Sequence, residues 1–358
     1  MQMPELLRRK RYASDLDDAE WALIEPLIPP LIDKGWGAAS RWHRRDIVDG
    51  IFYVLKTGCP WRDLPGDFPH WNSVWGCFRR WRVDGTLTGI HATLRGQVRV
   101  AAGRDPEPSL GLIDSQSVKG TEYTTSQHKP RVDSVDAIVA ALLEPHSAAA
   151  QGITTEQIAT AVLGPDHQVP IDQIVTVVTA VLSGAQEAPA RPIPKDRDQA
   201  GYDGGKKVKG RKRHLLVDSL GLVQSVVVHG ADVHDSVGAT LVLARRVGTM
   251  PRLEKILADT AYQGPLLDWT KAVWGVTMEV VRRADEVKGF VVQKWRWIVE
   301  RTHAWLGRSR RLTRGYERLA ATDEAMVLVA MTRIMLRRLA HPERDTFRGV
   351  KAFQQVAA

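Results

Sequence analysis

From residue 109 onward, short apolar segments alternate with longer segments of helical periodicity, and this alternation constrains the fold most. The apolar segments are "SLGLIDSQSV", the two runs joined by "DSLG" in "HLLVDSLGLVQSVVVHGADV", then "LEKILAD" and "TMEVVRR". Helical periodicity is present in "GATLVLARRVG", "PLLDWTKAVWG", "WRWIVERTHAWLGRSRR" and "EAMVLVAMTRIMLRRL". Strands that alternate with helices predict an α/β (α+β) domain over residues 105–345, with a mixed sheet covered by helices.

Residues 1–100 have a helical pattern instead. Aspartates precede the apolar periodicity of "DLDDAEWALIEPLIP", and Gly58 is placed to end the helix in "HRRDIVDGIFYVLKTG". After the turn segment "CPWRDLPGDFPHW", Asn72 or Ser73 can cap a helix in "NSVWGCFRRWRVDG". Its expected outward basic side chains are Arg79, Arg80 and Arg82. Helix, tight connection and basic helix are the outline of a helix-turn-helix DNA-binding domain, and equally of any small helical bundle.

Residues 126–200 differ from the rest of the chain in composition. They contain five basic and nine acidic residues, and no Phe, Tyr or Trp. Their apolar pieces, such as "IDQIVTVVTAVLSG", begin at capping residues and end at Gly or Pro. We therefore expect a compact helical acidic insertion within the α/β domain. Its negative charge repels phosphate, so a role in protein contacts is favoured over DNA binding.

The whole chain is basic, with a formal net charge of +9 and an isoelectric point of about 9.6. Such a balance indicates a polyanionic partner without proving one. No apolar run approaches the roughly 20 residues of a membrane span, and the N-terminus lacks a secretory signal pattern, so we expect a cytoplasmic protein with no membrane partner. Cys59 and Cys77 have no zinc-ligand spacing and are expected to be reduced thiols.

The segment "WRWIVERTHAWLGRSRR" holds one acidic residue, Glu300, among several arginines. At helical spacing its apolar residues form one stripe, while Glu300 shares the other side with Arg296, His303 and Gly307. One interpretation is a surface ion pair between Glu300 and Arg296, which contributes about 0–1 kcal/mol. The other is an acid held among phosphate-binding side chains, which requires partner carboxylates elsewhere in the chain.

Two aspartates are candidates for those partners. Asp114 lies within the first apolar strand, where an ionised carboxylate is costly unless cations offset it, and Asp259 follows the "LEKILA" strand. Taken singly, Asp114 could be a hydrogen-bonded edge residue and Asp259 a turn former. If both converge with Glu300, the three could hold two Mg²⁺ ions through oxygen ligands. Such a pair activates a water or a 3′-hydroxyl for in-line attack on a phosphodiester.

Other polar residues in the domain are weaker candidates. Asp218 is interpreted as the hairpin turn, and Asp232, His234 and Asp235 as a polar turn or as spare ligands. A basic stretch precedes the second strand and is either a solvated loop or a clamp on the DNA backbone. Its six cationic residues are Lys206, Lys207, Lys209, Arg211, Lys212 and Arg213.

Five ordered segments of the chain resemble one known family. They are "FYVLKTGCPWRDLPGDFPHWNSVWGCFRRWRVDG", "GLIDSQSVKGTE", "GYDGGKKVKGRKRHLLVDSLGL", "ILADTAYQG" and "RWIVERTHAWLGRSRRL". Together they resemble the bacterial insertion-sequence transposases of the DDE class, specifically the insertion-sequence-five (IS-five) family. The resemblance covers most of the chain outside residues 126–200.

The resemblance implies an RNase H-like catalytic domain in which Asp114, Asp259 and Glu300 are the DDE residues and metal ligands. The cofactor would be Mg²⁺, with Mn²⁺ as an alternative. Double-stranded DNA would be the partner, both the terminal inverted repeats of the transposon and the target, bound by a homodimer in the bacterial cytoplasm at the nucleoid. The basic residues expected to meet DNA phosphates from the helix of Glu300 are Arg296, Arg301 and Arg308.

The chain departs from the family's pattern at several positions. Gln293 and Gly307 stand where related transposases often carry Tyr and Lys, and His303 occupies a commonly aromatic position. The insertion after "SVKGTE" is the largest departure. Two other functions stay open: a catalytically silent, transposase-derived DNA-binding regulator, and a stand-alone RNase H-like nuclease. The presence of all three carboxylates favours the transposase.

Overall fold

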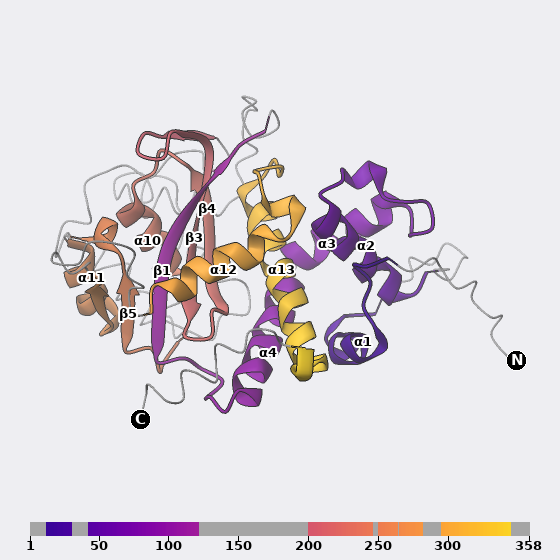
Figure 1. Ribbon diagram of the computed structural model, residues 1–358, viewed down its shortest axis with the longest axis horizontal. Coiled ribbons are helices and arrows are strands. Elements are labelled where there is room, and N and C mark those ends of the chain that lie inside the picture. The colour runs from indigo at the N-terminus through magenta and orange to yellow at the C-terminus, as the bar shows by residue number, and fades with distance from the viewer. Residues whose placement is uncertain are drawn as a thin grey trace, which may run out of the picture. The chain divides into compact units, whose positions relative to one another are not determined.

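The computed structural model describes residues 12–30, 42–121, 200–245, 250–263, 265–281 and 295–344. The chain divides into two compact units, shown with their elements in Figure 1. Unit 1 comprises residues 1–106, 309–311 and 328–358, and unit 2 comprises residues 107–308 and 312–327. Except for Ala200, the predicted helical insertion lies outside the described residues. No helix in the described ranges is long and apolar enough to cross a membrane.

Unit 1 is helical, as the pattern of its sequence predicts. Its helices are α1 (Asp18–Ile24), α2 (Arg44–Thr57), α3 (Trp71–Val83), α4 (Thr86–Ala101) and the part of α13 (Ala320–Ala340) that follows residue 327. The expected helix ends are confirmed at two places. Asp17 caps α1 in a reciprocal capping box with Glu20, and Gly58 ends α2 with a φ of 76°. That left-handed conformation favours glycine because it has no Cβ.

The start of α3 differs from the prediction. His70 is the N-cap, and its ring Nδ1 accepts a hydrogen bond from the backbone N–H of Asn72, so the assignment of the cap to Asn72 or Ser73 was wrong. The connection between α2 and α3 spans residues 58–70 and includes the short 3₁₀ helix η2 (Trp61–Asp63). It is therefore longer than the turn of about three or four residues in a minimal helix-turn-helix.

Ion pairs tie the later part of α13 to α1 within unit 1. The Glu20 side chain is only 3% exposed and pairs with the guanidinium of Arg333, while His341 contacts the Asp17 carboxylate. A buried carboxylate that loses its cation destabilises a fold strongly. The helical N-terminal region therefore depends on residues that are distant in sequence.

Unit 2 contains a mixed sheet of six strands within the described residues. They are β1 (Leu110–Lys119), β2 (Gly201–Asp203), β3 (Val208–Asp218), β4 (Val223–Gly230), β5 (Lys255–Ala258) and β6 (Thr277–Val280). The path is β2-β3-β1-β5-β6, with β4 also paired to β3. The pairs β1–β3, β2–β3 and β3–β4 are antiparallel, whereas β5 is parallel to β1 and to β6.

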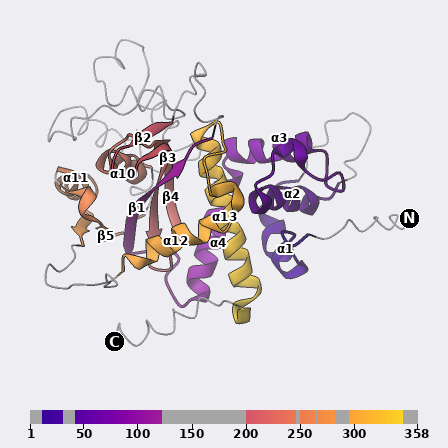
Figure 2. The same cartoon turned by 45° about the horizontal axis from the view of Figure 1, so that its top comes forward.

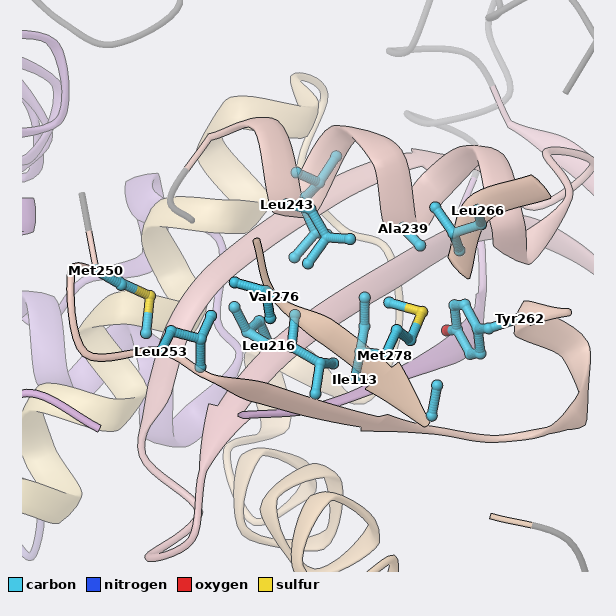
Figure 3. Packing of buried hydrophobic residues seen from close by; sticks show 14 residues of the cluster. Ile113, Leu216, Ala239, Leu243, Met250, Leu253, Tyr262, Leu266, Val276 and Met278 are labelled. Atoms are coloured by element: carbon cyan, nitrogen blue, oxygen red, sulfur yellow. The ribbon is translucent and has the colours of Figure 1, made fainter. Parts of the chain in front are cut away.

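Helices cover both faces of this sheet, with α10 (Asp235–Ala244) and α12 (Trp297–Gly307) on opposite sides (Figures 1 and 2). Figure 3 shows the core beneath α10, where Ile113 and Leu216 of the strands meet Ala239 and Leu243. Leu266 of α11 (Pro265–Trp274) joins the same cluster. The predicted α/β fold class with a helical N-terminal region is confirmed, and the strand order is consistent with an RNase H-like sheet.

Candidate active site

The pairing of β1 and β5 brings the two candidate aspartates level with each other. These strands run parallel with Leu112 opposite Leu257, so two residues further on Asp114 stands level with Asp259. Successive side chains along a strand point to opposite faces. Ile113 belongs to the core under α10, so Asp114 faces the other side, toward α12. The expectation that the two strands bring these carboxylates together agrees with this register.

Helix α12 is fixed on that face by its buried stripe. Ile298, Val299 and Thr302 are almost fully buried, as the helical spacing predicts. Thr302 Oγ1 donates a hydrogen bond of 2.8 Å to the carbonyl of Gly221 in the β3–β4 turn. The guanidinium of Arg301 lies 4.5 Å from the ring centroids of both Trp297 and Trp305 and donates to the carbonyl of Leu220. These contacts leave Arg296, Glu300 and His303 on the other side of the helix.

Arg296 links two of the three candidate carboxylates. Its Nη2 lies 3.5 Å from Asp259 Oδ2 and 3.7 Å from Glu300 Oε1. The Arg296–Glu300 ion pair considered from the sequence is therefore present, yet the same guanidinium also serves Asp259. Asp259 Oδ1 meanwhile accepts a hydrogen bond from the backbone N–H of Ala261, so this residue is a turn former as well. The structure brings Asp259 and Glu300 to one cation.

His303 and Lys206 complete the surroundings of Asp114. His303 Nε2 lies 3.7 Å from Asp114 Oδ2, and neither ring nitrogen has a hydrogen-bond partner within the described ranges. Burial, reinforced by the positive charges of Arg213 and Lys206, lowers the pKa of His303 to about 4. Lys206 Nζ donates a hydrogen bond of 3.4 Å to the backbone carbonyl of Ser115. An unprotonated imidazole and an ammonium group thus lie close to the carboxyl group of β1.

The pKa of Asp114 is raised to about 6, mainly by burial and in addition by the negative charge of Asp259. The backbone N–H of Ser115 and the cations Arg296 and Lys206 lower the pKa, but do not cancel the effect of burial. The positive charges beside Asp114 therefore offset only part of the cost of burying its ionised form. An added cation beside this carboxyl group would favour the ionised form.

A different group of potential ligands is packed more tightly. Within the described part of the chain, Asp17, Glu20 and His341 form the one group of three whose donor atoms all lie within 4.8 Å of one another. Asp17 and Glu20 form the capping box of α1, and Arg333 already supplies a positive charge there. The carboxylate oxygens of Asp114, Asp259 and Glu300 therefore do not all lie within 4.8 Å of one another.

The weaker acidic candidates do not join the triad. Asp218 accepts hydrogen bonds from the backbone N–H groups of Leu220 and Leu222, which confirms the turn interpretation. His234 is the N-cap of α10, and Asp232 is exposed in the preceding bend. Asp235 Oδ1 lies 2.8 Å from Lys212 Nζ and pairs with it, on the α10 side of the sheet.

The basic stretch before the second strand needs a correction, because β3 begins at Val208 and half of the expected loop is buried strand. Arg211 donates to the carbonyls of Glu317 and Arg318, and Lys212 pairs with Asp235. Arg213 pairs with Asp323 at 2.8 Å, with both side chains at most 2% exposed. These three cations are used inside the protein, so the expectation that they contact DNA is not met. The exposed lysines of the stretch are Lys206, Lys207 and Lys209.

The other predicted DNA contacts differ in exposure. Arg79 on α3 and Arg308 at the end of α12 are exposed, whereas Arg80 and Arg82 are half-buried. Arg301 is held between its two tryptophans, and Arg296 lies among the carboxylates. Sequence reasoning missed the place of His303 in this site. The available signal was its spacing of three residues from Glu300, which puts both on one side of the helix.

Comparisons with known proteins cover most of the chain. Residues 105–335 match the family described as "Transposase DDE domain", and residues 16–91 match the one described as "Putative transposase of IS4/5 family". No solved structure matches the chain significantly.

Two curated relatives come from Burkholderia cepacia. "Insertion element IS402 uncharacterized 16.2 kDa protein" is 35% identical over 108 residues, which are 29% of this chain and 72% of the relative. "Putative transposase for insertion sequence element IS402" is 30% identical over 118 residues, 31% of this chain and 56% of the relative. The chain thus spans little more than half the length of the second relative.

Proposed function

The chain belongs to the insertion-sequence transposases with a DDE domain, and on this premise we propose that it cuts and joins DNA at the ends of its own element. In this proposal Asp114, Asp259 and Glu300 are the catalytic residues and the metal ligands. The substrate is double-stranded DNA, namely the terminal inverted repeats of the element and a target.

One observation carries the proposal. Two carboxylates stand on neighbouring parallel strands, and the guanidinium of Arg296 connects one of them to a third carboxylate on a helix. Asp114 and Asp259 stand level on β1 and β5, and Arg296 lies within 3.7 Å of an oxygen of both Asp259 and Glu300. The three are far apart in sequence. Three carboxylates at one place are costly in a fold unless they serve a cation.

The donor set fits a divalent cation. Carboxylate oxygens are the ligands that Mg²⁺ prefers, and Mn²⁺ accepts the same set. The raised pKa of Asp114 supports this fit, because burial, with a smaller effect of Asp259, disfavours its ionised form and a bound cation would stabilise that form. When bound, the metal supplies the activated hydroxyl and the charge stabilisation that an in-line attack on a phosphodiester requires.

The chain's own residues would position this chemistry. Thr302 and Arg301 anchor α12 on the β3–β4 turn and so keep Glu300 over the strands. Arg296 and Lys206 place positive charge beside the carboxylates, where phosphate oxygens of bound DNA would need donors. The exposed lysines Lys207 and Lys209, with Arg79 and Arg308, would contact phosphates further along the duplex.

We extend the proposal to assembly and location. Two ends must be cut and joined in one event, which favours a homodimer on DNA. Cleavage and joining would take place in the bacterial cytoplasm, at the nucleoid where the DNA lies. The acidic insertion of residues 126–200 would serve protein contacts, because its composition disfavours phosphate binding.

The test is an assay with purified protein, DNA that carries the element's own ends and a separate target plasmid, with Mg²⁺ or with EDTA. We expect cleavage at the ends only with the metal, and joining of the released 3′ ends to the target. Cleavage without joining would indicate a stand-alone nuclease. Specific binding with no cleavage in Mg²⁺ or Mn²⁺ would indicate a DNA-binding regulator, and either outcome would overturn the proposal.

A further inference from the structure

His303 is a buried polar side chain that has no hydrogen-bond partner among the described residues. It lies on α12 one turn after Glu300, and its side chain is only 7% exposed. In that part of the chain neither Nδ1 nor Nε2 makes a hydrogen bond. Buried polar atoms are nearly always satisfied, and an orphan of this kind calls for a reason such as a bound ion. Two orphaned nitrogens on one ring beside the candidate active site therefore need an explanation.

The nearest carboxylate is too distant for a hydrogen bond with this ring. His303 Nε2 is 3.7 Å from Asp114 Oδ2, whereas N–H···O bonds fall at about 2.7–3.2 Å. Two ligands of one divalent ion, each at about 2.1 Å, lie roughly 3.0 Å apart when adjacent and about 4.2 Å apart when opposite. The observed separation falls between these limits, so the two atoms are spaced as ligands of a common ion.

Metal binding by this ring requires its neutral form. A neutral imidazole offers a lone pair, and metal-bound histidines are neutral. Within the described ranges, Asp114 is the acidic residue that pairs with this ring.

We propose that His303 supplies a nitrogen ligand to the divalent cation held by Asp114 and its partner carboxylates. This inference rests on the proposed function, because it presumes a metal at the triad. The site would then combine three oxygen donors with one nitrogen donor. Imidazole binds transition metals better than it binds Mg²⁺, whereas carboxylates suit both. The protein would therefore favour Mn²⁺ over Mg²⁺ more strongly than a site made of carboxylates alone.

The test is pulsed electron paramagnetic resonance of the full-length protein loaded with Mn²⁺, with and without double-stranded DNA. Histidine labelled with ¹⁵N identifies the coupled nucleus. We expect hyperfine coupling to a directly bound imidazole nitrogen in the unaltered chain. His303→Phe keeps a ring of similar size without a nitrogen, and it should lose the coupling while still binding Mn²⁺. Its affinity for Mn²⁺ should fall about tenfold, with a much smaller change for Mg²⁺.

Two further variants sharpen the result. His303→Asn serves if the Phe variant does not fold, and it should lose the coupling as well. His91→Asn alters a buried histidine of unit 1 and should leave the signal unchanged. Bound Mn²⁺ without nitrogen coupling, or coupling that persists in both His303 variants, would overturn this inference alone. Failure of the unaltered protein to bind Mn²⁺ or Mg²⁺ at any condition would contradict the proposed function itself.

Discussion

At the residue scale, Asp114 is a carboxyl group whose burial works against stability. Strand alternation turns its side chain away from the core of Ile113, but burial still withdraws it from water. The carboxyl group then faces Asp259, which raises its pKa further. A residue selected only for folding would be apolar or amide-bearing at this position. On the proposed function, the cation that it would hold accounts for a carboxylate at this position.

We predict that Asp114→Asn stabilises the fold at pH 7.5 in EDTA. The folded-state pKa of about 6 exceeds the ordinary value of 3.8, so the stabilising, protonated form is fully present below pH 3.8 and is lost as the pH rises through 6. At pH 7.5 the ionised group therefore costs on the order of 2 kcal/mol, which the amide removes. Urea unfolding of both proteins at pH 7.5 and at pH 4 measures this.

The gain should shrink toward zero at pH 4, where the native carboxyl is already protonated. Asp218→Asn is the matched control, because it changes the same charge at a carboxylate that accepts backbone hydrogen bonds. It should not raise stability. A loss of stability in Asp114→Asn at pH 7.5 would show that the charge is already compensated inside the protein.

At the scale of elements, the start of β3 at Val208 explains why half of the basic stretch is buried. Alternate residues of a strand face opposite sides, so Arg211 and Arg213 reach one face while Lys212 and His214 reach the other. Through these cationic side chains, β3 is linked to elements on both faces of the sheet. Lys206 and Lys207 precede it in the turn after β2, and Lys209 is its second residue; these exposed lysines are the members of the stretch that we propose contact DNA.

We expect Arg213→Gln to weaken folding and not DNA binding. It would leave Asp323, whose side chain is 1% exposed, buried without its cation. Removal of one partner from a buried ion pair typically costs about 3–5 kcal/mol. The free energy of unfolding from urea titration measures the effect, with the exposed Arg308→Gln as the control. An unfolding free energy equal to that of the control would mean that the pair contributes nothing.

The double variant Lys207→Gln with Lys209→Gln should weaken DNA binding and leave folding almost unchanged. Both side chains are exposed, so unfolding should change little. If each contacts a phosphate, the slope of log affinity against log salt should fall by about one unit per lysine. Fluorescence anisotropy over a salt series gives that slope. An unchanged slope would remove this turn from the DNA-contacting surface.

The sequence predicted elements well where periodicity was strong and failed where it was weak. The stripe of α12 and the turn at Asp218 followed from spacing and turn chemistry. The start of β3 was missed because its first residues are charged and give no apolar alternation. Helix α4 was not separated from its neighbours, although Leu87, Ile90 and Leu94 have helical spacing.

The site was predictable only in part from the residues. Spacing alone left Glu300 as a plain surface ion pair, and the resemblance to a family singled out the triad. Asp114 and Asp259 stand side by side because of the register between β1 and β5. That register depends on long-range strand pairing, which no local pattern encodes. The position of His303 against Asp114 depends on how α12 docks, so its burial could not be read from the chain.

At the scale of the whole molecule, the helical unit is not contiguous in sequence. Residues 328–358 join residues 1–106 in unit 1, and Arg333 is the cation of the buried Glu20. The N-terminal helices are therefore not complete by themselves. A fragment that ends near residue 100 would lack Arg333, the cation that pairs with Glu20, so DNA binding is best measured on the full chain.

We predict that Arg333→Gln loosens α1 in the full-length protein. The Arg333 side chain is 13% exposed, whereas Arg337, at 3.9 Å from the same Glu20 oxygen, is 54% exposed. Loss of the buried ion-pair partner should lower the free energy of local opening of α1 by about 1–3 kcal/mol. Amide hydrogen exchange of residues 18–24 should accelerate in Arg333→Gln and stay nearly unchanged in Arg337→Gln. Equal exchange in both variants would contradict this dependence on α13.

The most direct test of the central claim is the rate of end cleavage by amide variants of the triad. Asp114→Asn, Asp259→Asn and Glu300→Gln keep the shape of each side chain and remove the charge that would hold a metal. We predict that each lowers the single-turnover rate in Mg²⁺ by on the order of 10³-fold or more, while affinity for the element's ends stays within about threefold. Metal-dependent cleavage at a normal rate in any one variant would contradict the assignment of these three residues.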